Sequence, residues 1–278
     1  MKFILAGLGN WYAGLNLVKS TIPVAERLGF WGVGLPDHYM WGTKMGGEST
    51  LDSWVLLTYL ASRTESLRLG TLVTPIPLRP PSILAKVVST LDLLSGGRVF
   101  LGVGSGWSKV EFEGYSEWDE SRVRVDKTEE GLQLILKLWI TKKVTFHGKY
   151  YHAKNAVLEP KPFQNPHPQL LFAGFKSRML RLAGRYGNIC YIPPIADVNF
   201  LEGKQIVLGE ARRFKRKKEI SFADGIWFDS NYDPKLYANR IELARQRGCD
   251  YFVVPFRRDQ KFLNSMKDFG KNVLPSFS

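Results

Sequence analysis

The hydrophobic pattern is clearest between residues 67 and 107, where strand-like and helix-like periods alternate. A continuous apolar run at Leu67–Val73 has the length and composition of a buried strand. The apolar residues that follow lie at helical spacing, as Ile83, Leu84, Val87, Val88, Leu91 and Leu94. Ser95-Gly96-Gly97 ends this helix, and a second buried strand follows at Val99–Val103. Strand, helix and strand within about forty residues predict a βαβ unit with parallel strands.

The same alternation extends through the rest of the chain. Strands are predicted at Lys2–Leu8, Gly32–Leu35, Leu67–Val73, Val99–Val103, Leu170–Ala173, Asn188–Ile192, within Ile220–Phe228, and at Tyr251–Pro255. Helices are predicted over 18–28, 54–61, 81–94, 132–139, Ser177–Tyr186, Phe200–Lys218, Pro234–Arg247 and Gln260–Val273. This order predicts an α/β fold, a (β/α)8 TIM barrel forming a single domain over residues 1–278. A doubly wound open sheet is the alternative, because periodicity does not show whether the sheet closes.

Residues 141–169 interrupt the alternation between the fourth helix and the fifth strand. Short segments on both sides of Gly148 predict a β-hairpin. An extended connector is predicted from the proline series that follows, Pro160, Pro162, Pro166 and Pro168. Two other stretches, 36–47 and the charged stretch 108–120, are predicted to be loops.

Composition places the chain among soluble globular proteins, with 44% hydrophobic and 23% charged residues. Cys190 and Cys249 lie at or beside predicted strands, so we expect reduced core residues of a cytoplasmic protein and no disulfide. The apolar run after Lys2 is too short for a secretory signal, and no run reaches the length of a membrane span.

The net charge is +13, and its densest cluster lies on a predicted helix. This basic cluster consists of Arg212, Arg213, Lys215, Arg216, Lys217 and Lys218. A solvated helix face is the favoured interpretation, and a general attraction for anionic ligands is the next. Nucleic-acid binding is the least favoured, because Phe214 is the only aromatic residue in the cluster.

Two long motifs resemble the bacterial-luciferase-like superfamily, namely GTLVTP at 70–75 and LAKVVSTLDLLSGGRVFLGVGSGW at 84–107. The resemblance extends to Asp37-His38, Glu26–Phe30 and Ala173–Tyr186. Members of this superfamily are flavin-dependent monooxygenases and oxidoreductases that use the deazaflavin coenzyme F420. The resemblance implies a barrel fold, a small-molecule substrate, F420 as the cofactor with FMN as the alternative, and a homodimer.

Asp37 and His38 follow the second predicted strand, at the end of a parallel barrel where ligands bind. Histidine exchanges a proton near neutral pH, although a loop histidine that caps backbone groups gives the same pattern. The resemblance implies that His38 supplies a catalytic proton and that Asp37 contacts the cofactor and orients either His38 or the cofactor ring. Tyr39 and Trp41 of the same loop are expected to line the substrate.

Leu72, Val73 and Thr74 end the third predicted strand, and the residues alone indicate an ordinary strand end. The resemblance implies instead a non-proline cis peptide in this segment that supports the flavin ring.

The glycine-rich turn 102–106 lacks the helix and the later acidic residue of a dinucleotide-binding fingerprint. The resemblance implies that Ser105 and Gly106 contact the side chain of the cofactor. Trp107 stands where some F420-dependent sugar-phosphate dehydrogenases carry an acid. This departure argues against their substrate, and Trp107 is assigned to substrate binding.

The loop after the fifth strand leads into a helix through Gly174, Phe175, Lys176 and Ser177. Backbone amides at a helix start, together with a lysine and a hydroxyl, predict an anion site, and Ser177 as a simple N-cap is the alternative. By resemblance, Gly174, Lys176 and Ser177 bind the cofactor phosphate, although Phe175 departs from the small-residue pattern.

No metal site is expected, because His147, His152 and His167 have no acid at ligand spacing. The leading hypothesis is an oxidoreductase that transfers a hydride between F420 and an organic substrate. An FMN-dependent monooxygenase is the alternative, and a non-catalytic barrel that binds flavin or nucleic acid is a third hypothesis from another class.

Overall fold

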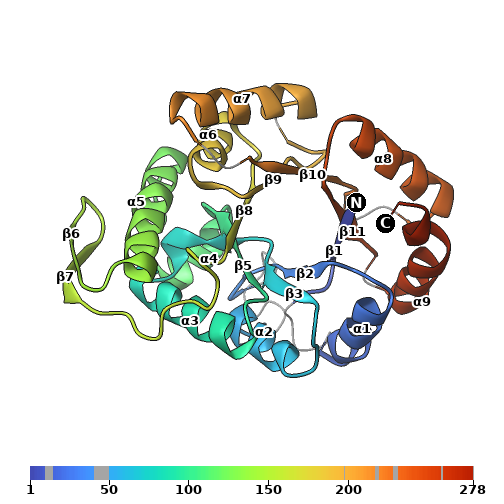
Figure 1. Ribbon diagram of the computed structural model, residues 1–278, viewed down its shortest axis with the longest axis horizontal. Helices are drawn as coiled ribbons and strands as arrows, with labels where there is room; N and C mark the ends of the chain where they lie inside the picture. Colours follow the sequence, from blue (N-terminus) through green and yellow to red (C-terminus); the bar gives the residue numbers. More distant parts are fainter. Residues whose placement is uncertain are drawn as a thin grey trace.

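The protein forms a closed barrel of parallel strands surrounded by helices (Figure 1). The computed structural model describes residues 1–9, 15–40, 50–196, 198–216, 219–227, 231–257 and 259–277. Its barrel strands are β1 (Lys2–Ala6), β2 (Gly32–Leu35), β3 (Arg68–Thr71), β5 (Val99–Gly104), β8 (Gln169–Ala173), β9 (Ile189–Tyr191), β10 (Ser221–Gly225) and β11 (Tyr251–Pro255). The ring closes because β3 pairs with β2 on one side and with β5 on the other. The predicted TIM barrel is therefore confirmed, and the open-sheet alternative is wrong.

An outer layer of helices covers the barrel. These helices are α1 (Leu15–Arg27), α2 (Ser53–Ala61), α3 (Pro81–Leu94), α5 (Ser121–Ile140), α6 (Ser177–Tyr186), α7 (Phe200–Arg213), α8 (Pro234–Gln246) and α9 (Phe262–Asp268). The strand residues alternate between this helical layer and the interior of the barrel. In β5, Leu101 and Val103 belong to the outer core, whereas Phe100 belongs to the inner one. Burial on both faces explains why the strands are continuous apolar runs in the sequence.

Three glycines make room for a bulge after β3, where the Leu72–Val73 peptide bond is cis. A Cβ atom on Gly102 would lie 1.9 Å from the carbonyl oxygen of Thr71. On Gly34 it would lie 2.8 Å from Cβ of Leu72, and on Gly104 it would lie 2.5 Å from a methyl carbon of Val73. The flanking strands β2 and β5 therefore need glycine at these positions. Beyond the bulge, β4 (Thr74–Pro75) continues the pairing with β5.

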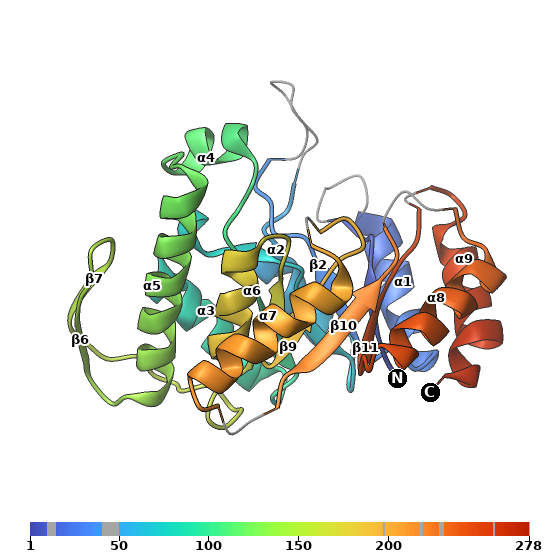
Figure 2. The same ribbon diagram turned by 90° about the horizontal axis from the view of Figure 1, so that it is seen from above.

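The charged stretch 108–120 was predicted to be a loop, and this is wrong for its first half. It contains the short helix α4 (Lys109–Tyr115), which buries Glu111 and Phe112. Seven residues are fewer than the two or three turns that a periodicity needs to be recognised. Figure 2 shows α4 at the end of the barrel opposite the two chain termini.

The inward face of α3 differs from the predicted one. Ile83 is 62% exposed and Leu94 is 68% exposed, although both were predicted to face the core. Ser89 and Asp92 are buried instead, because they bind the proline-rich connector. The Ser89 hydroxyl donates to the carbonyl of Pro160, and Asp92 accepts from the backbone and side-chain amides of Gln164 at 2.9 and 2.7 Å.

The predicted hairpin is confirmed as β6 (Val144–His147) paired antiparallel with β7 (His152–Ala156). It lies outside the ring of helices beside α5 (Figure 1). Glu130 of α5 holds its turn, since its carboxylate accepts hydrogen bonds from the amides of Lys149, Tyr150 and Tyr151 at 2.7 to 2.9 Å.

The basic helix ends earlier than predicted, at Arg213 instead of Lys218. Lys215 adopts a φ of 50°, and the amide of Arg216 donates to the carbonyl of Ala211, which is the hydrogen bond of a Schellman C-cap. The Arg216 guanidinium then turns inward and donates to the carbonyl of Gly187 at 2.6 Å. The basic cluster is therefore not one continuous solvated face. Lys217 and Lys218 lie outside the described residues.

Cys190 and Cys249 are both buried and free, as expected, and burial raises the pKa of each thiol. Within the described ranges, no helix combines the length and the apolar character needed to cross a membrane.

We predict opposite effects for two glycine substitutions. Gly102→Ala should lower the free energy of unfolding by about 3 kcal/mol or more, because the new methyl group meets backbone that cannot move without opening the barrel. Gly209→Ala in α7 should raise it by about 0.5–1 kcal/mol, since no atom lies within 4 Å of the new Cβ and alanine is the better helix former. Urea denaturation measures both, and a Gly102→Ala protein of unchanged stability would contradict the close approach.

Candidate active site

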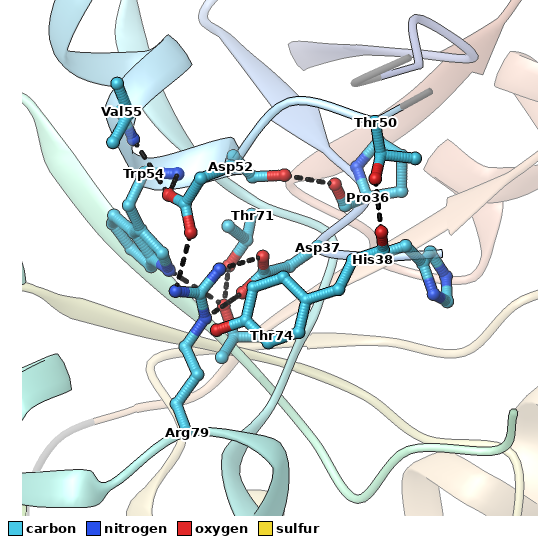
Figure 3. A network of polar contacts seen from close by, with 12 residues as sticks. Pro36, Asp37, His38, Thr50, Asp52, Trp54, Val55, Thr71, Thr74 and Arg79 are labelled. Atoms are coloured by element: carbon cyan, nitrogen blue, oxygen red, sulfur yellow. Dashed lines mark hydrogen bonds and ion pairs between the residues drawn. The ribbon is translucent and has the colours of Figure 1, made fainter. Parts of the chain in front are cut away.

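The candidate site lies at the carboxyl end of the barrel, where the loops after β2, β3 and β5 meet. A charged cluster at its base joins the loop after β2 to the segment after β3 (Figure 3). Arg79 donates through Nε and Nη2 to the two oxygens of Asp37, at 3.0 and 2.6 Å, and its Nη1 lies 2.8 Å from the carboxylate of Asp52. The Thr74 hydroxyl donates to Asp37 at 2.7 Å and accepts from the indole N–H of Trp54 at 3.2 Å.

Asp37 therefore has a different environment from the one expected. It is 2% exposed, and both of its oxygens accept hydrogen bonds from Arg79. Figure 3 shows the His38 ring pointing away from this cluster, and the side-chain hydrogen bonds described for Asp37 are with Arg79 and Thr74. Burial disfavours a charged guanidinium, but the nearby Asp37 and Asp52 carboxylates outweigh this and raise the pKa of Arg79. Thr74, also expected to contact a cofactor, is buried and bound to Asp37.

The residue that does contact the His38 ring is Glu111 of α4. Its carboxylate is 1% exposed and lies 2.9 Å from Nδ1 of His38. It also accepts hydrogen bonds from the backbone amides of Tyr39 at 2.5 Å and Met40 at 3.2 Å. Because an ionised carboxylate only accepts, this geometry keeps the proton of a neutral ring on Nδ1 and makes Nε2 the acceptor. Sequence reasoning missed Glu111, which is 73 residues away along the chain.

Aromatic side chains contact His38 and its neighbour Tyr39. Trp107 and the His38 ring are in a T-shaped arrangement, with centroids 5.6 Å apart at an interplanar angle of 74°. Tyr39 lies between the guanidinium of Arg79, at 4.6 Å from its ring centre, and the ring of Tyr115, at 4.9 Å. Burial raises the pKa of Tyr39 to about 12, with Arg79 opposing the shift. Trp41, the other expected substrate residue, lies outside the described residues.

The remaining predicted cofactor residues lie on the same end of the barrel. Leu72 and Val73 are half-buried beside the interior core, and the peptide bond between them has the cis form that the resemblance implied. Ser105 is half-buried, and Gly106 adopts a φ of 78°. A Cβ on Gly106 would lie 2.4 Å from the ring of Phe112, so only glycine allows α4 to pack this closely after β5.

The start of α6, where an anion site was predicted, differs in detail from the expected arrangement. The Gly174 amide donates to the carbonyl of Tyr191 at 2.9 Å, so it is engaged in the sheet. Ser177 is the first helical residue and not the N-cap; Lys176 occupies that position, and its side chain makes no capping hydrogen bond. The first-turn amides of α6 therefore remain candidates for an anion, alongside the exposed Lys176.

The histidines outside the site have other surroundings. His147 and His152 face each other in the hairpin register, and the ring of His167 stacks on Trp139 with centroids 5.9 Å apart. The described part of the chain contains no group of three His, Cys, Asp or Glu side chains that is suited to a metal ion.

A comparison with protein families matches residues 12–199 to the model described as luciferase-like monooxygenase. The chain belongs to this family. The family resemblance inferred from the sequence is therefore confirmed, and the luciferase-like fold is seen in a solved neighbour as well. An F420-dependent secondary alcohol dehydrogenase, solved with an F420–acetone adduct, superposes with a TM-score of 0.81 at 21% identity, over 99% of each chain.

The relatives of this luciferase-like chain use both of the cofactors expected from its sequence. An F420-dependent glucose-6-phosphate dehydrogenase of Segniliparus rotundus is 36% identical over 62% of this chain and 51% of its own length. An FMNH2-dependent dimethylsulfone monooxygenase of Pseudomonas putida is 33% identical over 62% of this chain and 46% of its own length. The chain spans about half the length of these relatives.

We predict that Arg79→Met destabilises the protein by about 3–5 kcal/mol, because it leaves the Asp37 carboxylate buried without its counter-charge. Arg178→Met is the matched control, since Arg178 pairs with the half-exposed Asp126. Its loss should lower the free energy of unfolding by less than about 1 kcal/mol. Guanidinium denaturation compares the two variants. An Arg79→Met protein as stable as the control would exclude a structural role for the cluster.

Proposed function

We propose that the protein is an oxidoreductase that transfers a hydride between coenzyme F420 and an organic substrate, with His38 as the proton-handling residue. The observation that carries this proposal is the contact between Nδ1 of His38 and the buried carboxylate of Glu111 at the carboxyl end of the barrel. Hydride transfer at a carbon that bears oxygen needs a partner for the oxygen-bound proton, and a histidine of fixed tautomer fits that role.

The residues at the barrel mouth fit a ring with a phosphate-bearing side chain. The half-buried Leu72 and Val73 offer an apolar support for a flat ring, and the uncapped first turn of α6 with Lys176 and Ser177 offers amides and a cation for a phosphate. Ser105 and Gly106 lie at the end of β5 and would contact the linking chain. When bound, F420 supplies a two-electron hydride carrier, and the protein supplies position and control of the proton.

The roles of the protein residues follow from their contacts. Glu111 holds the ring of His38 and, through two backbone amides, the loop that carries it. Nε2 is then the ring atom that accepts a proton from a substrate hydroxyl, or returns it to a carbonyl oxygen in the reverse direction. Trp107 packs against the His38 ring in a T-shaped contact and limits the access of water from that side.

FMN in a monooxygenase is the second candidate, and the Pseudomonas putida relative supports it. The test is equilibrium dialysis of the protein against each cofactor. We predict tighter retention of F420, because its acidic tail should favour a chain of net charge +13, and this part of the affinity should weaken with added salt. Equal or tighter retention of FMN would replace the F420 proposal with the monooxygenase.

Three substitutions test the proton path. His38→Ala should lower kcat by about 10² to 10⁴, while F420 affinity changes much less. Glu111→Gln should lower kcat by about 10-fold or more, since the amide no longer fixes the charge and tautomer of the ring. Glu113→Gln is the control on the same helix, because Glu113 is exposed and pairs only with Lys109 at 3.6 Å among the described residues. An undiminished kcat in a folded His38→Ala protein would remove His38 from the mechanism.

A homodimer is a further part of this proposal. Helices α2 and α3 are neighbours, and their exposed apolar side chains include Val55 (70%), Ile83 (62%) and Leu94 (68%). Exposed apolar side chains on adjacent helices are typical of a protein–protein interface. Sedimentation velocity should give a dimer for the natural chain and a monomer for Ile83→Glu. A monomeric natural chain would refute the homodimer and would not affect the proposed reaction.

A further inference from the structure

The charge beside His38 is opposite in sign to the charge of the whole chain. The carboxylate that contacts the His38 ring is Glu111, and Asp37, the residue before His38, forms a charged cluster with Asp52 and the guanidinium of Arg79. These three carboxylates and one guanidinium have a net charge of −2. Physiological salt screens exposed charges beyond about 8 Å, so the distant basic residues do not cancel the cluster for a substrate bound at His38.

Arg79 is not available to bind an anionic substrate. Each of its three guanidinium nitrogens lies within 3.0 Å of a carboxylate oxygen of Asp37 or Asp52, and its side chain is 13% exposed. Lys109, the nearest cation on α4, forms an exposed pair with Glu113 and adds no net charge. A phosphate brought to this position would meet carboxylates without gaining a guanidinium partner.

The wall next to His38 is apolar. Trp107 contacts the histidine ring in a T-shaped arrangement and is 70% exposed, so most of the indole surface is open to a ligand. Val110 and Tyr115 of α4, which lies on the same end of the barrel, are 42% and 58% exposed. Covering an exposed aromatic side chain that is held by one ring contact with a flat or alicyclic molecule is favourable.

We propose that the substrate is an uncharged alcohol or carbonyl compound with an aromatic or alicyclic body that lies on Trp107, and that phosphorylated sugars are excluded. This inference rests on the proposed function, because it takes His38 as the point where the reacting oxygen binds. It separates this chain from the F420-dependent glucose-6-phosphate dehydrogenases to which it is similar in sequence. Trp107 sets the preference for the body of the substrate, and the carboxylate cluster rejects anions.

The test compares an uncharged alcohol with its carboxylated analogue, which differs from it by one carboxylate, and with a phosphorylated sugar. Dissociation constants are measured by ligand-observed NMR for 1-phenylethanol, for 4-(1-hydroxyethyl)benzoate and for glucose 6-phosphate, with and without F420. The natural chain should bind 1-phenylethanol at least about tenfold more tightly than either anion. Trp107→Ala should weaken the binding of 1-phenylethanol at least about fivefold. Phe163→Ala, which removes a 62% exposed aromatic side chain of the connector, should leave this binding unchanged. A tenfold difference in dissociation constant corresponds to about 1.4 kcal/mol of binding free energy.

A second pair of variants isolates the charge effect. Glu111→Gln should reduce the ratio between the dissociation constants of 4-(1-hydroxyethyl)benzoate and 1-phenylethanol. Glu113→Gln should leave this ratio unchanged. Equal or tighter binding of either anion, no detectable binding of 1-phenylethanol, or binding that is indifferent to Trp107→Ala overturns the inference. Failure of the proposed function is read separately, as the loss of F420 retention in dialysis, which does not depend on these ligands.

Discussion

The geometry of the candidate site depends on one guanidinium, that of the half-buried Arg79. Arg79 joins the loop after β2, through Asp37, to the start of α2, through Asp52, which is also the N-cap of that helix. Thr74 adds the segment beyond the cis peptide to the same cluster. A buried ion pair contributes little net stability over an apolar pair, but losing one partner is costly, so the three segments are held in one arrangement.

His38 stands between this cluster and a second carboxylate. On one side, its neighbour Asp37 is fixed by Arg79; on the other side, Glu111 binds the ring and the next two amides. The loop is thus held through the Asp37 side chain before His38 and through two backbone amides after it, and the ring itself has a defined hydrogen-bond partner. This division of roles explains why two acids are needed near a single histidine: one fixes the chain, and the other fixes the imidazole.

The sequence predicted the barrel and the position of the site, because both depend on local patterns. Apolar runs such as Val99–Val103 and the helical spacing at Ser177–Tyr186 are short-range signals, and the carboxyl ends of parallel strands meet at one edge. Partners that are distant in the chain could not be read in the same way. Glu111 sits on a helix too short to show a period, and the exposed Ile83 belongs to a helix whose buried polar residues face the connector.

Gly106 lies between the barrel strand β5 and the helix α4, which carries Glu111, and it has no functional group of its own. The ring of Phe112 occupies the space that any side chain at this position would need. Any other residue at position 106 needs Phe112, and with it α4, to move, and Glu111 lies on the same helix. In evolutionary terms, the contact between the acid and the histidine is therefore sensitive to a position that carries no reactive group.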